Sequence, residues 1–377
     1  MKVLWITNIP SPYRMKFFSE LGSKCELTVL FERAFSYERN ESWRDYKFQN
    51  FNGIVMKGIN TGVDTAICIE VVKYLKKGVY DIIVISNVST LTGMLAIEIL
   101  NIKKIPFIIE GDGAIAKSGN GFKEKIKTHL NKNAVVWFST GENHDKYYLK
   151  YGANKNNICR YPFTSLMEND ILNNLIDERK KAELKEKHKL PKNKKIVLAV
   201  GRFIYLKGFD ILIESLRNIK EEYYLLIIGG GEEKDRYYKL IKKYNLKNIE
   251  LKEFIDPTVL KEYYMLADLF VHPTRKDIWG LVINEAMSYG LPVITTDKCV
   301  AGLELIEDCS NGFIVPANNI KKLSDRIGQI LNNEELRKNM CINNLKKVKK
   351  YTIENMANIH IDYFNKLIIN GESELDA

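Results

Sequence analysis

The chain has 377 residues, of which 45% are hydrophobic and 28% charged, a balance typical of a folded protein and unlike that of a disordered one. Its length suits two domains of ordinary size. The formal net charge is +10, but much of it lies in lysine-rich stretches such as residues 178–195, so charge alone does not indicate a nucleic-acid partner.

The six cysteines are scattered and show no CxxC spacing, which argues against a disulfide framework or a zinc site. The N-terminus lacks the long apolar region of a signal peptide, and no stretch approaches the roughly 20 apolar residues that cross a bilayer. We therefore expect a cytoplasmic protein, with peripheral contact to the inner face of the membrane as a further hypothesis.

Short apolar runs alternate with helical patterns along most of the chain, which predicts parallel sheets covered by helices. In the first half we expect strands at residues 2–7, 26–31, 80–86, 105–110 and 134–139. In the second half we expect them at residues 195–201, 223–230, 248–254, 269–274, 292–296 and 312–316. Each half therefore resembles a doubly wound α/β unit.

A polar, charged stretch separates the two sets of strands, and a basic helical segment without strands follows the second set. We expect an N-terminal Rossmann-like domain over residues 1–165, a linker over 166–194, and a second Rossmann-like domain over 195–345. Residues 346–377 are expected to form a helical segment that packs back toward the first domain. The predicted fold is thus α/β, with two Rossmann-like domains facing each other across a cleft.

Two loops of the second domain carry residues suited to a phosphorylated ligand. After the strand at residues 195–201, Gly201, Arg202, Lys207 and Gly208 lie in one loop, and an arginine and a lysine together suit a diphosphate. An ordinary surface loop with two cations is an equally good interpretation when this loop is taken alone.

The second loop lies in the run KDIWGLVINEAMSYG, where Gly280 precedes the start of a helix. The N-terminus of a helix exposes amide groups that hold phosphate oxygens. Asp277 falls in the loop and Glu285 in the second turn of the helix, so both carboxylates can border one pocket and accept hydrogen bonds from sugar hydroxyls.

Taken in order, the GRxxxxKG loop, the GxG at residues 229–231 and the D-x7-E from Asp277 to Glu285 resemble family 4 of the retaining glycosyltransferases, which have the GT-B fold. The resemblance covers essentially the whole second domain. It implies that Arg202 and Lys207 bind the diphosphate of a nucleotide-sugar and that Asp277 contacts the donor sugar. The donor-binding residues that it implies are Gly201, Gly229, Gly231, Phe254, Ile255, Gly280, Leu281, Val282 and Glu285.

The sequence departs from the family pattern at two positions. The first acid of the family's usual E-x7-E is Asp277 here, which is one methylene shorter and changes the expected sugar contact. Glu253 stands where many relatives have a glycine, before Phe254 and Ile255, which the resemblance places beside the base.

In the first domain, the loop after the first strand holds Tyr13 and Arg14, which we expect to point at the acceptor or to begin a helix. After the strand at 105–110, residues 111–116 match GxGxxA, but no acid follows about 20 residues later, so we reject a dinucleotide site. The resemblance places this strand end near the reacting sugar. Glu110 is therefore an acceptor-binding candidate and Asp112 a catalytic one.

Residues 121–130 form a basic amphipathic pattern. It predicts a helix that contacts anionic lipid or a pyrophosphate-linked acceptor, or else an ordinary helix whose apolar face lies in the core. No DxD motif or HExxH spacing is present, so we expect no metal site and no cofactor other than the nucleotide-sugar co-substrate.

The predicted function is retaining, metal-independent transfer of a hexosyl or N-acetylhexosaminyl group. The expected donor is a nucleotide-sugar, with UDP as the first choice of nucleotide. A saccharide or lipid-linked saccharide in surface polysaccharide assembly is the expected acceptor, by analogy with the family. The alternative is a sugar-nucleotide epimerase or phosphorylase of the same fold, while the absence of an aromatic-basic motif argues against nucleic-acid binding.

Overall fold

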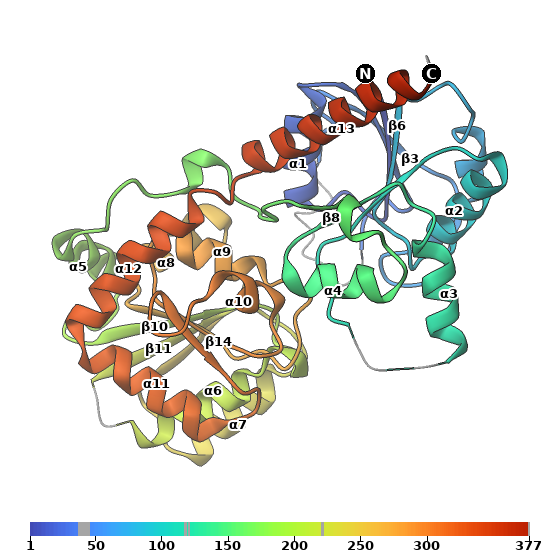
Figure 1. Ribbon diagram of the computed structural model, residues 1–377. Helices are drawn as coiled ribbons and strands as arrows, with labels where there is room; N and C mark the ends of the chain where they lie inside the picture. Colours follow the sequence, from blue (N-terminus) through green and yellow to red (C-terminus); the bar gives the residue numbers. More distant parts are fainter. Residues whose placement is uncertain (37–45, 117–118, 120, 220–221, 376–377) are drawn as a thin grey trace. The chain divides into compact units, whose positions relative to one another are not determined.

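The computed structural model describes residues 1–36, 46–116, 119, 121–219 and 222–375 of the chain (Figure 1). The chain divides into two compact units, one of residues 1–165 and 351–377 and the other of residues 166–350. Each unit has its own parallel sheet and its own hydrophobic core. Within the described ranges, no helix is long and apolar enough to span a bilayer.

The first unit is built on a seven-stranded parallel sheet in the order β3-β2-β1-β6-β7-β8-β9. The order reverses between β1 and β6, and ligands of such sheets bind beyond the carboxyl ends of the strands at a reversal. The strands of the sheet are β1 (Lys2–Thr7), β2 (Glu26–Phe31), β3 (Asn52–Val55), β6 (Ile82–Ile85), β7 (Ile108–Glu110), β8 (Val136–Ser139) and β9 (Ile158–Arg160). A separate antiparallel pair consists of β4 (Ile59–Asn60) and β5 (Ala66–Ile67).

Helices pack against this sheet because its central strands are apolar along nearly their whole length. Leu4 and Ile6 of β1 share a core with Ala96 and Leu100. The helices of the unit are α1 (Pro12–Gly22), α2 (Leu91–Lys103), α3 (Phe122–Asn131), α4 (Glu142–Lys150) and α13 (Ile353–Leu375).

An aromatic cluster joins β1, α1 and the C-terminal helix α13. The ring of Trp5 lies 5.5 Å from Phe17 of α1 and 5.6 Å from His360 of α13. His360 also stacks on Phe138 of β8 at 4.2 Å and is fully buried. The helical segment expected over residues 346–377 is thus α13, and it packs against α1 of the first unit.

The second unit contains a six-stranded parallel sheet in the order β12-β11-β10-β13-β14-β15, with its reversal between β10 and β13. Its strands are β10 (Lys195–Val200), β11 (Tyr223–Ile228), β12 (Ile249–Lys252), β13 (Leu269–His272), β14 (Val293–Thr296) and β15 (Gly312–Val315). Its helices are α5 (Glu178–Lys187), α6 (Phe209–Ser215), α7 (Lys234–Lys243), α8 (Pro257–Leu266), α9 (Leu281–Ser288), α10 (Val300–Leu305), α11 (Ile320–Asn332) and α12 (Glu334–Val348).

Residues 166–194, which we expected to be a linker, are part of the second unit. They include α5, which packs against α8 and is capped by the side chain of Asp177. Lys181 Nζ lies 3.1 Å and Lys185 Nζ 3.7 Å from the buried carboxylate of Asp268, at the start of β13. These ion pairs attach α5 to the sheet even though the helix is polar on most of its surface.

The structure confirms all eleven strands expected from the sequence, with each observed strand lying inside its expected range. The sequence did not indicate β3, β4, β5 and β9. All four are short, and at two to four residues they are close to the lower limit of strand length.

Candidate functional site

Two loops follow β10 and β13, the neighbouring strands at which the order of the second sheet reverses. The first, residues 201–208, passes through a 3-10 turn at Tyr205–Lys207 into α6, and the second, residues 273–280, leads into α9. At Gly208 φ is +68°, and a β-carbon would come within 2.2 Å of the carbonyl oxygen of Pro273. This glycine therefore allows the two loops to touch.

A lysine, an aspartate and a histidine form a largely buried chain of contacts across these loops. Lys207 Nζ lies 2.5 Å from Asp277 Oδ2, and His272 Nε2 lies 2.9 Å from the same oxygen. Burial alone would raise the pKa of Asp277, but the hydrogen bond from His272 and the charge of Lys207 outweigh it and lower that pKa. Asp277 is therefore an ionised carboxylate held from two sides.

His272 is neutral, because burial lowers the pKa of its imidazole. Since the ionised carboxylate of Asp277 can only accept a hydrogen bond, the single ring proton of His272 lies on Nε2. His272 at the end of β13 thereby holds Asp277 without adding charge to the loop.

Helix α9 begins directly after Gly280, where φ is +103°. A β-carbon at this position would lie 2.9 Å from Cys299 Sγ and 3.5 Å from Asp277 Oδ2, so the start of the helix lies against the aspartate. Leu281 and Val282 belong to its first turn, whose N–H groups have no acceptor within the helix. An anion placed here would meet these amides and the positive end of the helix dipole.

Glu285 lies further along the same helix and is half-buried. The hydroxyl of Tyr264 donates a hydrogen bond to Glu285 Oε2 at 3.0 Å, and the ring of Tyr264 stacks on Tyr289 with 5.4 Å between centroids. The carboxylate is therefore oriented by α8, and a carboxylate has several lone pairs with which to accept hydrogen bonds.

The loop after β11 approaches the loop after β10. At Gly229 a β-carbon would come within 1.9 Å of the carbonyl oxygen of Gly201, so the two backbones are in contact. Gly231 lies against Phe203, whose carbonyl oxygen would be 2.6 Å from a β-carbon. Arg202 lies between Gly201 and Phe203 and is half-buried.

The loop after β12 presents an aromatic side chain to solvent. Phe254 is 53% exposed, and its ring lies against Gly230, while Ile255 is half-buried. Glu253, the departure from the family pattern, forms an exposed ion pair with Lys234 of α7.

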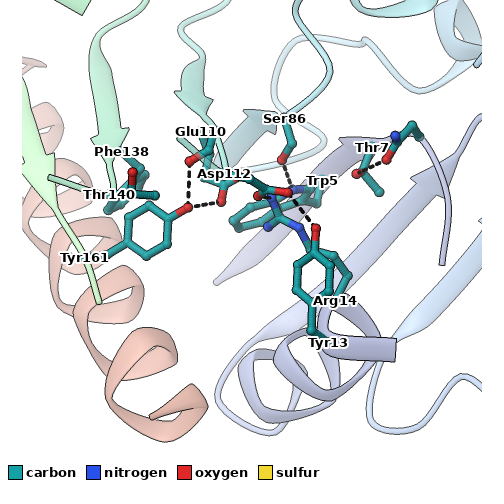
Figure 2. Close-up of polar contacts among 12 residues, drawn as sticks. Trp5, Thr7, Tyr13, Arg14, Ser86, Glu110, Asp112, Phe138, Thr140 and Tyr161 are labelled. Carbon is teal, nitrogen blue, oxygen red and sulfur yellow. Dashed lines mark hydrogen bonds and ion pairs between the residues drawn. The ribbon is translucent and has the colours of Figure 1, made fainter. Parts of the chain in front are cut away.

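In the first unit, all four side chains named from the sequence meet at the ends of β7 and α1 (Figure 2). Arg14 Nη2 lies 2.8 Å from Glu110 Oε2 and also contacts Asp112 Oδ1, while the hydroxyl of Tyr13 donates to Asp112 Oδ2 at 2.6 Å. Residues from two distant parts of the sequence are therefore assembled into one polar cluster.

These four residues differ in how deeply they are buried. Arg14 is 3% exposed and Glu110 1%, whereas Tyr13 and Asp112 are half-buried. Burial alone would raise the pKa of Glu110, but the charge of Arg14 lowers it, so the two form an interior ion pair. The geometry gives Arg14 and Glu110 a supporting position and leaves Tyr13 and Asp112 nearer the surface.

Comparison with known proteins gives this geometry a family context. Residues 180–347 match the family model described as glycosyl transferases group 1, and they lie within the second unit. The second unit is a group 1 glycosyl transferase domain. The matched range contains Arg202, Lys207, Asp277 and Glu285, and the match confirms the family resemblance expected from these residues.

Two curated relatives each match less than half of the chain. The amylovoran biosynthesis glycosyltransferase AmsD of Erwinia amylovora is 32% identical over 147 residues, which are 38% of this chain and 41% of the relative. The capsular polysaccharide biosynthesis glycosyltransferase CapM of Staphylococcus aureus is 31% identical over 177 residues, 44% of this chain and 45% of the relative. The chain thus spans less than half the length of these relatives.

A solved structure resembles nearly the whole chain. The Anabaena protein HepE, in complex with UDP, has a TM-score of 0.79 and 15% sequence identity, and the likeness covers 97% of this chain and 100% of HepE. At this identity the likeness shows the fold. The chain has the GT-B fold expected from the sequence, with the group 1 domain as its second unit.

The structure brings Lys207, Asp277 and Gly280 of the group 1 domain into direct contact and holds Glu285 on the helix that follows. The roles assigned to these residues, and to Tyr13, Arg14, Glu110 and Asp112, stay predictions. Among the described residues, no three His, Cys, Asp or Glu side chains are grouped so that they could hold a metal ion, and metal independence also stays a prediction.

Sequence reasoning did not identify several supporting residues. His272 is one of them, although its position at the end of a strand, just before the loop that carries Asp277, could have indicated it. The hydroxyl oxygen of Tyr161 lies 2.5 Å from Glu110 Oε1 and 2.9 Å from the carbonyl oxygen of Gly111, and its one proton is directed at these two acceptors. Tyr161 follows β9, a strand that was not predicted, so its position could not be anticipated.

Proposed function

We propose that this protein transfers a sugar from a nucleotide-sugar to a saccharide or lipid-linked saccharide acceptor during the assembly of a surface polysaccharide. The observation that carries the proposal is the meeting of Lys207, Asp277 and the first turn of α9 at the reversal of the second sheet. Ligands bind at such reversals, and a cation beside the N-terminus of a helix suits a diphosphate. AmsD and CapM, by their names, serve polysaccharide biosynthesis.

In the proposed donor complex, Lys207 and Arg202 bind the diphosphate together with the amides of Leu281 and Val282. Lys207 has three N–H donors, so it can keep its contact with Asp277 while it binds phosphate oxygens. Asp277 and Glu285 accept hydrogen bonds from the hydroxyl groups of the donor. UDP is the first choice of nucleotide because HepE, by its title, binds UDP.

The proposed reaction retains the anomeric configuration and requires no metal. Negative charge develops on the leaving diphosphate, where preorganised cations and amides stabilise it, and the leaving phosphate accepts the proton of the acceptor hydroxyl. On the first unit, Tyr13 and Asp112 are proposed to contact the acceptor or the sugar, with Arg14 and Glu110 holding Asp112 in place.

The test is the Lys207→Ala variant of the full chain. Transfer from the donor should fall about 100-fold, as expected when a preorganised donor to a developing charge is lost. Binding of UDP, measured by calorimetry, should weaken about 10- to 100-fold, because a hydrogen bond to a charged group contributes about 1.5 to 3 kcal/mol. Lys187→Ala, which removes an exposed lysine paired with Glu262 on the surface, is the matched control. Transfer and binding within a few-fold of wild type in Lys207→Ala would refute the proposal.

Product analysis addresses the rest of the reaction. A transferase releases nucleoside diphosphate in step with glycosylated acceptor, whereas an epimerase releases none and a phosphorylase consumes phosphate. NMR of the anomeric proton in the product tests retention. Activity in the presence of a chelator tests metal independence.

Peripheral membrane contact through α3 is proposed as part of this function. Phe122 at the start of α3 is 79% exposed and lies beside the exposed residues Lys123 and Lys125, while Leu130 at the other end is buried. An exposed aromatic ring among cations suits an anionic bilayer surface. Co-sedimentation with phosphatidylglycerol vesicles should occur at low salt, weaken at high salt and weaken again in Phe122→Ser; no binding at low salt would refute the contact.

A further inference from the structure

Arg275, which lies just after β13, connects three loops of the second unit. Its Nη1 and Nη2 lie 2.9 Å and 2.7 Å from the two carboxylate oxygens of Asp210. Nη1 also donates to the carbonyl oxygen of Tyr205 at 2.6 Å, and Nε donates to Asn318 Oδ1 at 2.7 Å. The guanidinium lies 4.0 Å above the ring of Tyr205, and the backbone N–H of Arg275 donates to Leu206 at 2.7 Å.

These contacts hold a turn that has little packing of its own. In the turn Tyr205–Lys207, Tyr205 is 53% exposed and Leu206 is 44% exposed, so neither side chain anchors the turn in the core. Arg275 reaches the ring of Tyr205 and the carbonyl groups of both residues. Lys207 is the next residue, and the position of its ammonium group depends on the position of this turn.

Arg275 is not arranged to bind a ligand directly. Its side chain is only 9% exposed, and all three guanidinium nitrogens already donate hydrogen bonds within the protein. Asp210, which is 4% exposed in its side chain, neutralises its charge. A planar fork that is bound on three sides and stacked on a ring fixes geometry, which a lysine in the same place could not do.

We propose that Arg275 is a positioning residue that holds the turn Tyr205–Lys207 so that Lys207 is preorganised for the donor diphosphate. This inference rests on the proposed function. It adds a residue that acts on Lys207 through the backbone of the turn.

The experiment compares Arg275→Gln and Arg275→Lys with the wild-type full chain. We first identify which of UDP, GDP and ADP the wild type binds, and then measure the affinity of each variant for that nucleotide by calorimetry. Both variants should bind about 10- to 100-fold more weakly, as is typical when a residue that orients a binding group is lost. Asp210 keeps Arg236 at 3.0 Å, so neither variant leaves this buried carboxylate unpaired.

Arg326→Gln is the matched control, because Arg326 also stacks on a ring, 4.2 Å above Phe313, but lies on α11 and not in either loop. It should bind the nucleotide as the wild type does. Thermal unfolding of both Gln variants provides a measure of folding that is independent of binding. Nucleotide binding in Arg275→Gln equal to that in Arg326→Gln, or wild-type binding in Arg275→Lys, would overturn the inference.

A double-mutant cycle with Lys207→Ala separates positioning of the lysine from an independent effect. If Arg275 acts through Lys207, adding Arg275→Gln to Lys207→Ala should weaken binding by no more than about twofold. Losses that multiply in full would overturn the inference. The proposed function fails separately, when Lys207→Ala itself binds the nucleotide as tightly as the wild type.

Discussion

Gly280 provides a sharp test of how closely α9 and Asp277 are packed. In Gly280→Ala the backbone of the alanine must keep φ near +103°, which costs about 1 to 2 kcal/mol for a residue with a side chain. It would also lie 2.9 Å from Cys299 Sγ, and overpacking of this kind costs about a further 1 to 3 kcal/mol. We expect a total loss of about 2 to 5 kcal/mol in the free energy of unfolding.

Gly78→Ala is the matched control, because φ is +77° there but nothing lies within 4 Å of the added β-carbon. It should show only the backbone term. Adding Cys299→Ala to Gly280→Ala removes the sulfur and should recover part of the loss, so that the two substitutions are not additive.

The assays are thermal unfolding, in which each kcal/mol lowers the midpoint by about 2 to 4 °C for a unit of this size, and UDP binding by calorimetry. UDP affinity should fall about tenfold in Gly280→Ala, since the β-carbon would also lie 3.5 Å from Asp277 Oδ2 and displace the first turn of α9. The reasoning is refuted if Gly280→Ala is no less stable than Gly78→Ala, or if Cys299→Ala recovers nothing.

Three further predictions concern the buried polar groups. Asp268→Ala leaves the two lysines of α5 without their carboxylate and should lower the free energy of unfolding by about 3 to 5 kcal/mol, measured in urea. Lys192→Ala, which opens an exposed pair with Glu186, should change it little. Burial lowers the pKa of His360 to about 4, whereas in the unfolded chain it is about 6.5. As the pH is lowered from about 6.5 to 4, the unfolded chain therefore binds the proton first, and the free energy of unfolding falls by about 1.4 kcal/mol per pH unit. His360→Phe should reduce this loss, measured by urea titrations at pH 7 and pH 5. Tyr161→Phe removes the hydroxyl 2.5 Å from Glu110 and should cost about 1.5 to 3 kcal/mol, measured by urea unfolding; an unchanged midpoint would contradict the assigned hydrogen bond.

The sheets and the candidate loops could be predicted from the sequence because both depend on local patterns. Strands buried on both faces are continuous apolar runs, and in parallel sheets the loops at their carboxyl ends are where ligands bind. The Lys207 and Asp277 loops were therefore found, although these residues lie 70 positions apart.

The linker prediction was made because α5 is polar on nearly every side. Of its residues only Leu184 and Lys185 are buried, so the sequence has no hydrophobic pattern that predicts a helix packed on a sheet. Its attachment depends on Asp268, which is 87 positions from Lys181. Pairings of this kind depend on tertiary geometry and leave no local signal.

The same limit applies to Arg275 and Arg14. Arg275 is one of several cations in its region, and only its position 65 residues after Asp210, with the carboxylate turned toward it, distinguishes it from the others. Arg14 was expected to face a ligand, since nothing in its neighbourhood in the sequence shows that Glu110 will neutralise it 96 residues later.

The aromatic cluster around Trp5 has a consequence for biosynthesis. His360 and Phe364 of α13 belong to the same core as Trp5 of β1, so the first unit cannot complete its core until α13 has left the ribosome. The 166–350 segment emerges earlier and is contiguous, so it can acquire its native structure while the opening strands are still waiting for their final partner. During that interval the aromatic side chains of β1, α1 and β8 lack the packing partners that α13 supplies, and they expose an apolar surface. A chain that terminates before α13 should therefore be bound by chaperones or degraded.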